Sequence, residues 1–179
     1  MSQYKTGSVT VTLNSNAVTG SGTAFLANVA VVEDSGANRV MTSADGITWA
    51  TRTAAAALNW YAVAWSPTLS LFAAVAQTGS GNRIMTSPDG ITWTSRTSPA
   101  DIAWVDIIWC EELGLFVACS FYTDGYSIMT SYDGISWDLR RTGNLNFNAL
   151  AWSPQLGVIV GTGFITSTQK TITSMFYHP

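Results

Sequence analysis

Short apolar stretches alternate with turn-forming residues along the chain. The stretches are rich in β-branched and aromatic residues, and Gly, Pro, Ser and Asp separate them, a pattern typical of β-strands. No segment keeps apolar residues at the helical spacing i, i+3, i+4 and i+7, and the run of residues 54–58 is too short for a stable helix. One part of the chain shows the pattern most clearly, and there it predicts four strands, at residues 61–65, 71–77, 83–86 and 91–97.

The pattern is an internal repeat. The segments RVMTSADGITWATRT, RIMTSPDGITWTSRT and SIMTSYDGISWDLRR begin at Arg39, Arg83 and Ser127, 44 residues apart. A second set, WYAVAWSPTLSLFAAVA, WVDIIWCEELGLFVACS and FNALAWSPQLGVIVGTG, begins at Trp60, Trp104 and Phe147. Four antiparallel strands in about 44 residues are typical of a propeller blade. We therefore expect an all-β, β-propeller-like fold of about four four-stranded blades.

The repeats divide a chain that we expect to be a single domain. Residues 1–29 are predicted to form an N-terminal β segment, and residues 30–179 the blade units, near 30–59, 60–103, 104–146 and 147–179. The last unit ends after a strand at residues 170–174, without a fourth strand. The period places the first strand of the first unit near residues 17–21 and a substitute fourth strand near residues 3–10. Two closures remain open, by this N-terminal strand or by exchange of strands between chains of an oligomer.

A seven-residue element, S-x-D-G-x-x-W, lies at each predicted turn between the third and fourth strands. Its Asp carboxylate can accept backbone N–H bonds across the turn, its Gly supplies a positive φ, and its Trp can cover the turn. The element is therefore predicted to be structural. It resembles a shortened Asp-box of sialidases and other propellers, where the box is scaffold away from the active site. Its residues are Ser43, Asp45, Gly46, Trp49, Ser87, Asp89, Gly90, Trp93, Ser131, Asp133, Gly134 and Trp137.

The Trp and Arg residues also follow the repeat. All eight Trp fall in equivalent columns, which favours packing between blades, and Trp49, Trp93 and Trp137 are expected at equivalent buried positions. Arg52, Arg96 and Arg140 share one column, just past each of these Trp residues. Because a column points the same way on every blade, we expect a capping or ladder role for these arginines.

Composition excludes several classes of protein. Charged residues make up only 11% of the chain, and the net charge is −3. No apolar run reaches the roughly 18 residues of a membrane span, so no membrane insertion is expected. Residues 1–6 are followed by no apolar segment, so no secretion signal is predicted. The eight basic residues are scattered, which makes nucleic acid an improbable partner.

Neither catalytic nor metal-binding groups gather in the sequence. The one histidine, His178, has no Cys or carboxylate at ligand spacing, so no metal site, cofactor or catalytic triad is predicted, and the protein is expected not to be an enzyme. Cys110 and Cys119 flank a predicted hairpin turn. A hairpin there would pair Cys110 near Leu115 and Cys119 near Asp106, too far apart for a disulfide, which predicts free thiols.

The residues that depart from the repeat are the candidate binding site. The second loop of the third unit reads SFYTDGYS, where the second unit has QTGSGN. Loops carry binding function more often than strands, and aromatic side chains beside polar ones are typical of glycan or protein contacts. Asp101 and Arg141 lie in the neighbouring loops and are expected on the same face. The candidate ligand-binding residues are Phe121, Tyr122, Asp124, Tyr126, Asp101 and Arg141.

The N-terminal segment, YKTGSVTVTLNSNAVTGSGTAFLANV at residues 4–29, resembles the opening of many tailed-phage fibre, tail and other virion-surface proteins. In that family a T-G-[ST]-V-x-V-T strand is followed by an Asn/Ser turn and then by V-T-G-S-G-T-x-[FW]. Residues 6–12, 14–16 and 18–23 match it, as does Phe25. The blade units are similar to repeats of phage-encoded proteins with SPDGITW boxes. The segment could serve as a virion anchor or as the closing strand.

These features give three functional hypotheses. The leading one is a non-enzymatic structural or adhesion component of a tailed-phage virion, either a head decoration or a tail or fibre protein, assembled in the host cytoplasm. Its expected partners are other virion proteins or copies of itself, with host surface glycan as a further partner. The alternatives are a free-standing, lectin-like propeller that binds glycan and a sialidase-like hydrolase.

Overall fold

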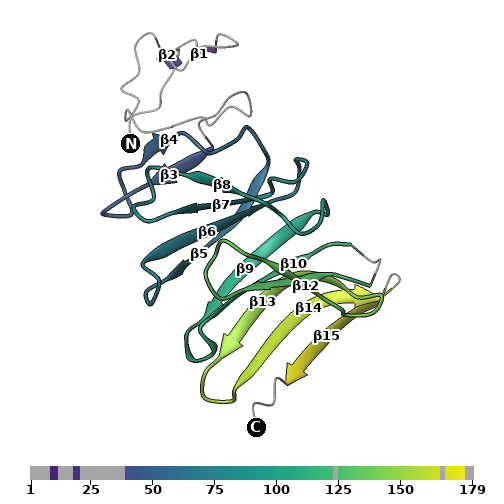
Figure 1. Ribbon diagram of the computed structural model, residues 1–179. Helices are drawn as coiled ribbons and strands as arrows, with labels where there is room; N and C mark the ends of the chain where they lie inside the picture. The colour runs from purple at the N-terminus through teal and green to yellow at the C-terminus, as the bar shows by residue number, and fades with distance from the viewer. Residues whose placement is uncertain (1–8, 12–17, 21–38, 123–124, 166–167, 176–179) are drawn as a thin grey trace, which may run out of the picture.

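The protein is an array of antiparallel β-sheets. The computed structural model describes residues 9–11, 18–20, 39–122, 125–165 and 168–175, and within these it contains five sheets. Two are two-stranded, β1 (Val9–Val11) with β2 (Val18–Gly20) and β3 (Val40–Thr42) with β4 (Ala50–Arg52). The other three are larger and follow one another along the chain (Figure 1).

The larger sheets are built in chain order. The first contains β5 (Trp60–Ser66), β6 (Leu71–Ala76), β7 (Ile84–Ser87) and β8 (Thr94–Arg96). The second contains β9 (Trp104–Cys110), β10 (Leu115–Ser120), β11 (Ile128–Ser131) and β12 (Asp138–Arg140). The third contains β13 (Asn146–Ser153), β14 (Val158–Ile165) and β15 (Thr168–Met175). A single turn of 3₁₀ helix, Glu111–Leu113, joins β9 to β10 and is the one helical element in the described part of the chain.

Repeated sequence gives repeated register. Ile84 pairs with Arg96 and Ile128 with Arg140, 44 residues further on. Both four-stranded sheets carry a β-bulge near the start of their first strand, at Trp60/Ala62 and at Cys119/Ser120 opposite Trp104. The predicted all-β class is therefore confirmed, and the repeat sets the pairing as well as the strands.

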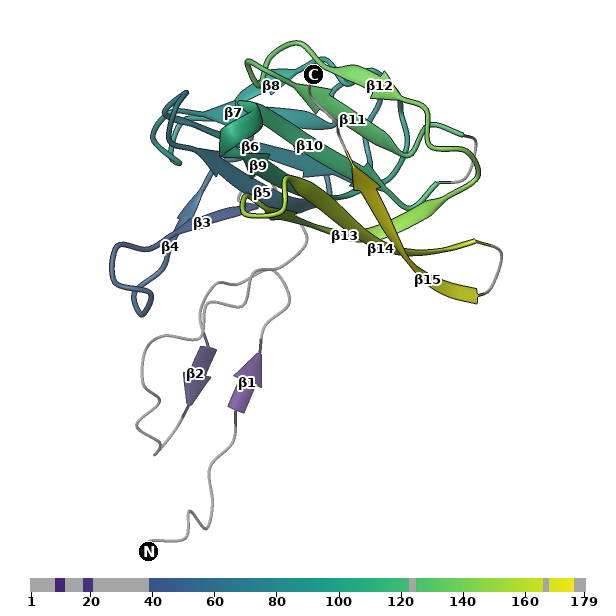
Figure 2. The same ribbon diagram turned by 90° about the horizontal axis from the view of Figure 1, so that it is seen from below.

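The sheets pack face to face in chain order. We call the contact between β3–β4 and β5–β8 the first interface, that between β5–β8 and β9–β12 the second, and that between β9–β12 and β13–β15 the third. β5 contacts β9 and β9 contacts β13, so the β9–β12 sheet lies between the other two (Figure 1, Figure 2).

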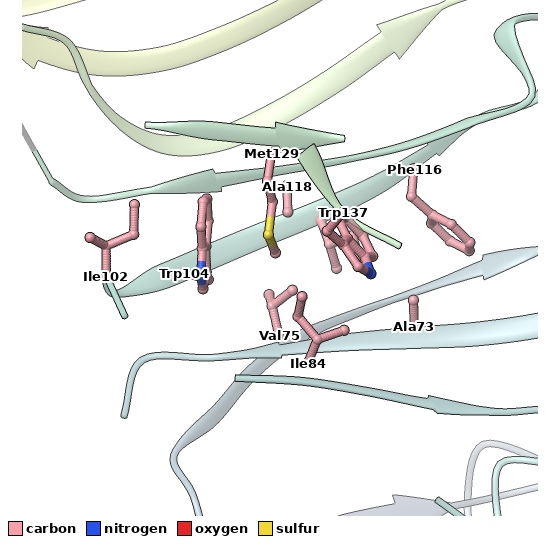
Figure 3. Packing of buried hydrophobic residues seen from close by; sticks show 10 residues of the cluster. Ala73, Val75, Ile84, Ile102, Trp104, Phe116, Ala118, Met129 and Trp137 are labelled. Carbon is pink, nitrogen blue, oxygen red and sulfur yellow. The ribbon is translucent and has the colours of Figure 1, made fainter. Parts of the chain in front are cut away.

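The second interface holds a core of complementary shapes. Small and aliphatic residues of β6 and β7, Ala73, Val75 and Ile84, face the large side chains of the β9–β12 sheet (Figure 3). Trp104 and Phe116 on that side are 0% exposed. Full burial of such aromatic side chains is the largest contribution to the stability of a core of this kind.

Strand ends differ from those predicted at one or two residues, except at the fourth strand. The predicted strand at residues 91–97 is shortened to Thr94–Arg96, because residues 91–93 belong to the Asp-containing turn. The first strand is longer than predicted at both ends, Trp60–Ser66, and the strand predicted at residues 170–174 extends over Thr168–Met175.

Closure by the N-terminal strand is not seen among the described residues, and residues 3–8 of the predicted closing strand lie outside them. β1 overlaps the end of the strand predicted near residues 3–10, and it pairs with β2, with Val9 opposite Gly20. β15 pairs with β14 alone among the described strands. A hairpin between neighbouring segments needs only a short loop, whereas pairing the two ends of the chain has a larger entropic cost.

The prediction of equal burial for the three turn Trp residues is wrong. Trp137 is 8% exposed, Trp93 is half-buried and Trp49 is 52% exposed. Trp137 and Trp93 each face the sheet that precedes their own. Trp137 faces a four-stranded sheet and Trp93 the two-stranded β3–β4 pair. Trp49 borders an open cavity between β3 and the β5–β8 sheet.

The two thiols lie as predicted. Cys110 is paired with Leu115 and Cys119 with Asp106, and both thiols are free and buried. Burial raises the pKa of the Cys110 thiol to about 12 and that of Cys119 further still, which disfavours the thiolate form of both at neutral pH. Within the described residues, no helix has the length and apolar character needed to cross a membrane.

Candidate functional site

The antiparallel order of the strands separates two kinds of connection. The turns between first and second strands and between third and fourth strands lie at one end of each sheet, which we call the turn end. The connections β6–β7, β8–β9, β10–β11 and β12–β13 lie at the opposite end, which we call the loop end. The Asp-containing elements are therefore at the turn end, and the candidate binding residues are at the loop end.

The Asp-containing turn is a closed hydrogen-bond network. Asp89 Oδ1 accepts from the backbone N–H of Ile91 at 2.8 Å and of Thr92 at 2.7 Å, and from Ser87 Oγ at 2.9 Å. Ser87 Oγ in turn accepts from the N–H of Gly90 at 2.8 Å, and Gly90 has a φ of 72°. The same bonds recur around Asp45 and Asp133. One oxygen of each carboxylate, Oδ1, is thus held by its own turn.

This network lowers the pKa of the carboxylates. Hydrogen bonds from the backbone of Thr92 and Ile91, followed by the Ser87 hydroxyl, lower the pKa of Asp89 to about 2. The corresponding bonds from Thr48, Ile47 and Ser43 depress the pKa of Asp45. A carboxylate held ionised by backbone donors is a structural acceptor and a poor general acid.

The arginine column forms a cross-strand ladder. Nε of Arg52, Arg96 and Arg140 donates to the hydroxyl of Thr42, Thr86 and Thr130 at 3.0, 2.8 and 2.8 Å. Thr86 and Thr130 are buried on the third strand of their sheets. The three arginines thus stand on three successive sheets, each bound to its own sheet, and do not converge on one point.

The candidate loop exposes aromatic rings at the loop end. Phe121 and Tyr122 are each 47% exposed, and Tyr126 is 41% exposed. The backbone around them is held by its neighbours, because Phe121 N donates to Ala103 O at 3.2 Å and Thr142 N donates to Gly125 O at 2.9 Å. The loop is therefore tied to the connections on both sides of its sheet.

The other candidate residues have different places. Asp101 lies at the same end but is bound to the preceding sheet, where Oδ1 accepts from Gly81 N at 2.6 Å and Oδ2 from Ser80 Oγ at 3.1 Å. It also lies 3.7 Å from Arg83 Nε. Arg141 is exposed beside Thr142, and Asp124 lies outside the described residues. Of the predicted candidate residues, the structure therefore leaves the exposed rings of the loop, with Arg141 in the neighbouring connection, as the candidate site.

Three acidic residues of the third unit were missed by the sequence reasoning. Asp106 Oδ2 accepts from Leu150 N at 2.6 Å across the third interface. Glu111 accepts from Thr68 Oγ1 at 2.5 Å, and Glu112 accepts from Trp152 Nε1 at 2.6 Å. All three depart from the repeat, since Ala62 and Ala149 stand where Asp106 does. The sequence could have singled out these three residues, because each differs from the residues at the equivalent positions of the repeat. In the structure, these differences mark contacts between sheets.

The exposed rings of the candidate loop are suited to contact and recognition. No group of three or more His, Cys, Asp or Glu is gathered for a metal ion among the described residues. The exposed rings of the loop can stack on a sugar ring or pack against an apolar protein surface.

Comparison with known proteins gives similarity of fold alone. No protein-family model matches the chain, and no curated protein matches it. Among solved structures, it is similar to a chain in the crystal structure of a nidogen/laminin complex, with a TM-score of 0.52 and 17% identity over 65% of this chain and 44% of that chain. A second is the extracellular domain of a hybrid two-component system from B. thetaiotaomicron, with a TM-score of 0.45 and 11% identity over 77% of this chain and 22% of that chain. The chain thus spans less than half the length of either.

Proposed function

We propose that the chain is a β-propeller-like, non-enzymatic structural or adhesion component of a tailed-phage virion. Three features support the propeller-like arrangement: the 44-residue repeat, the strand order within each sheet, and the face-to-face packing of successive sheets. The fold similarity to the chain of the nidogen/laminin complex is compatible with it.

The N-terminal segment carries the virion role. Residues 4–29 resemble the opening of phage fibre, tail and virion-surface proteins, and in the structure β1 pairs with β2 and leaves the β13–β15 sheet without it. This supports an anchor in a neighbouring virion protein, since the described strands of the segment pair with each other.

The repeated polar residues support a scaffold without catalysis. The turn carboxylates are used by backbone donors, and Arg52, Arg96 and Arg140 are each bound to a threonine of their own sheet. A sialidase-like hydrolase would need arginines that converge on a substrate carboxylate, so this alternative has the least support. The exposed loop of Phe121, Tyr122 and Tyr126 is the proposed contact with host glycan or a neighbouring protein.

Deletion of residues 1–12 tests the anchor. We expect the shortened protein to keep the unfolding midpoint of the full chain but to be lost from purified particles, as measured by mass spectrometry of virions. Asp138→Asn is the matched control, because it changes an exposed side chain outside both the N-terminal segment and the candidate loop. The double variant Phe121→Ala and Tyr122→Ala shows separately whether the loop takes part in incorporation. Normal incorporation of the deletion variant, or absence of the full chain from virions, would contradict the proposal.

A lectin-like propeller outside the virion is the second candidate, favoured by the exposed aromatic loop. A glycan array with the purified protein tests it, with the same double loop variant as control. Glycan binding that the loop variant abolishes, together with absence from virions, would favour the lectin. Turnover of a fluorogenic sialoside that is abolished by Arg96→Ala would instead favour the hydrolase.

A further inference from the structure

An apolar cavity of about 480 Å³ lies at the first interface, between β3 and the β5–β8 sheet. Val63 and Phe72 line it, and Val63 is 57% exposed. At the second interface their counterparts 44 residues further on, Ile107 and Phe116, are 3% and 0% exposed. The same face is thus covered in one sheet and open in the other.

The open face lies beside an edge strand. Among the described residues β3 pairs with β4 alone, whereas β7 and β11 have a strand on both sides. The missing neighbour corresponds to β6 and β10, which hold the same register, with Ala73 opposite Thr86 and Val117 opposite Thr130. An edge of this kind beside an apolar cavity is suited to the addition of a strand, since its backbone N–H and C=O groups need partners.

The repeat identifies a segment of the chain that could pair with the edge of β3. Shifted back by 44 residues, β6 (LFAAVA) falls on residues 27–32 (ANVAVV). Val29 and Val31 then take the places of Ala73 and Val75, both 0% exposed and both directed at the following sheet. Two valines at these positions would direct β-branched side chains at the open face of the β5–β8 sheet.

We propose that residues 27–32 add an antiparallel strand to the edge of β3 and fill the cavity, with Val31 opposite Val40 and Val29 opposite Thr42. The register follows from Val75 opposite Ile84 and Ala73 opposite Thr86. The occupant is this chain's own segment, and the docking depends on the repeat and not on the proposed virion role.

A pair of cysteines in the full chain tests the register. Opposite residues of antiparallel strands have Cα atoms about 4.5–5.5 Å apart, within the range of a disulfide. The test variant carries Val31→Cys and Val40→Cys. The matched control carries Ala30→Cys and Val40→Cys, because the side chain at position 30 points to the other face of the strand. The native thiols of Cys110 and Cys119 are buried, so we expect them not to form disulfides in this test.

We expect mild oxidation to remove both engineered thiols of the test variant, with an intrachain disulfide identified by mass spectrometry, and to leave the control reduced. A disulfide between two chains would overturn the assignment and identify a second copy as the occupant. No disulfide, or equal formation in the control, would overturn the proposal as well, while incorporation into virions would still be measured separately.

Hydrogen exchange of the unsubstituted protein gives an independent measurement in case the cysteine variants fail to fold. We expect slowed exchange at alternate amides of residues 27–32 and at β3, as for β6 and β7. Exchange throughout residues 27–32 as fast as that of an unstructured peptide would overturn the proposal.

Discussion

The first and second interfaces are built from the same repeat, but their side chains are covered to different extents. Trp137 at the second interface is 8% exposed, and its ring lies 6.1 Å from that of Phe116. Trp93 at the first interface has the same contact, 6.4 Å from Phe72, but it is only half-buried. The motif sets where the Trp ring points, and the preceding sheet decides how well it is buried.

The largest expected effect is at the turn Trp residues. Trp137→Ala should lower the free energy of unfolding by about 3–5 kcal/mol, because it leaves a cavity in a filled core. Trp49→Ala should cost about 0.5–1 kcal/mol, since that side chain is 52% exposed. Urea unfolding of both variants measures the difference. Equal costs would mean that a further sheet covers Trp49 in solution.

Trp93→Ala sharpens the same comparison. If residues 27–32 fill the cavity, Trp93→Ala should lower the free energy of unfolding by nearly as much as Trp137→Ala, because the Trp93 ring would then be covered on both sides. A cost close to that of Trp49→Ala would mean that the first interface stays open.

The third interface contains a hydrogen bond from Leu150 to Asp106 that has no counterpart at the second, where Ala62 stands in place of Asp106. Asp106→Ala should lower the free energy of unfolding by about 1–2 kcal/mol, because it leaves the partly buried N–H of Leu150 without its acceptor. Asp106→Asn keeps an oxygen acceptor and should lie close to the parent protein. If the two variants unfold alike in urea, the contact does not contribute to stability.

A smaller effect is expected in the arginine ladder. Arg96→Ala should cost about 1 kcal/mol, because Thr86 is 1% exposed and its hydroxyl loses a donor that water cannot replace. Arg52→Ala should cost less, since Thr42 at the first interface is only half-buried. Thermal unfolding of the two variants tests the order, and the reverse order would show that the ladder does not depend on burial.

The pH dependence of stability is expected to change least. The pKa of Asp89 is lowered from 3.8 to about 2 in the folded state, so its contribution is present above pH 4 and is lost as the pH falls toward 2. Asp89→Asn should therefore flatten the acid branch of the stability curve in this window. Exposed Asp138 provides the matched control, and an unchanged curve for Asp89→Asn would contradict the role of the turn bonds.

Much of the local structure could be predicted from the sequence. Alternation of apolar residues and turn-formers located the strands, the 44-residue period located their partners, and the Cys110–Leu115 pairing followed from the hairpin. These are short-range features, because a hairpin's register depends on its turn and on which face is buried. The ladder of Arg96 and Thr86 was also within reach, since both positions repeat together.

The candidate site was predictable only in part. The exposed rings of Phe121 and Tyr122 lie on the loop that the departure from the repeat singled out, but Asp101 is bound to the preceding sheet. The same signal at Asp106, Glu111 and Glu112 marks contacts between sheets. A departure from a repeat shows that a position is different, and only its neighbours in space show what the difference does.

The sequence by itself determined the strands, their order within each sheet and the hydrogen bonds of the turns, because each depends on residues close together along the chain. The tertiary structure decided which face of each sheet is covered and which acidic residues join neighbouring sheets. It also decided that β1 pairs with β2 instead of β15. The physical reason is that burial and long-range pairing depend on what lies across an interface, and identical repeats carry no information about which neighbour is present.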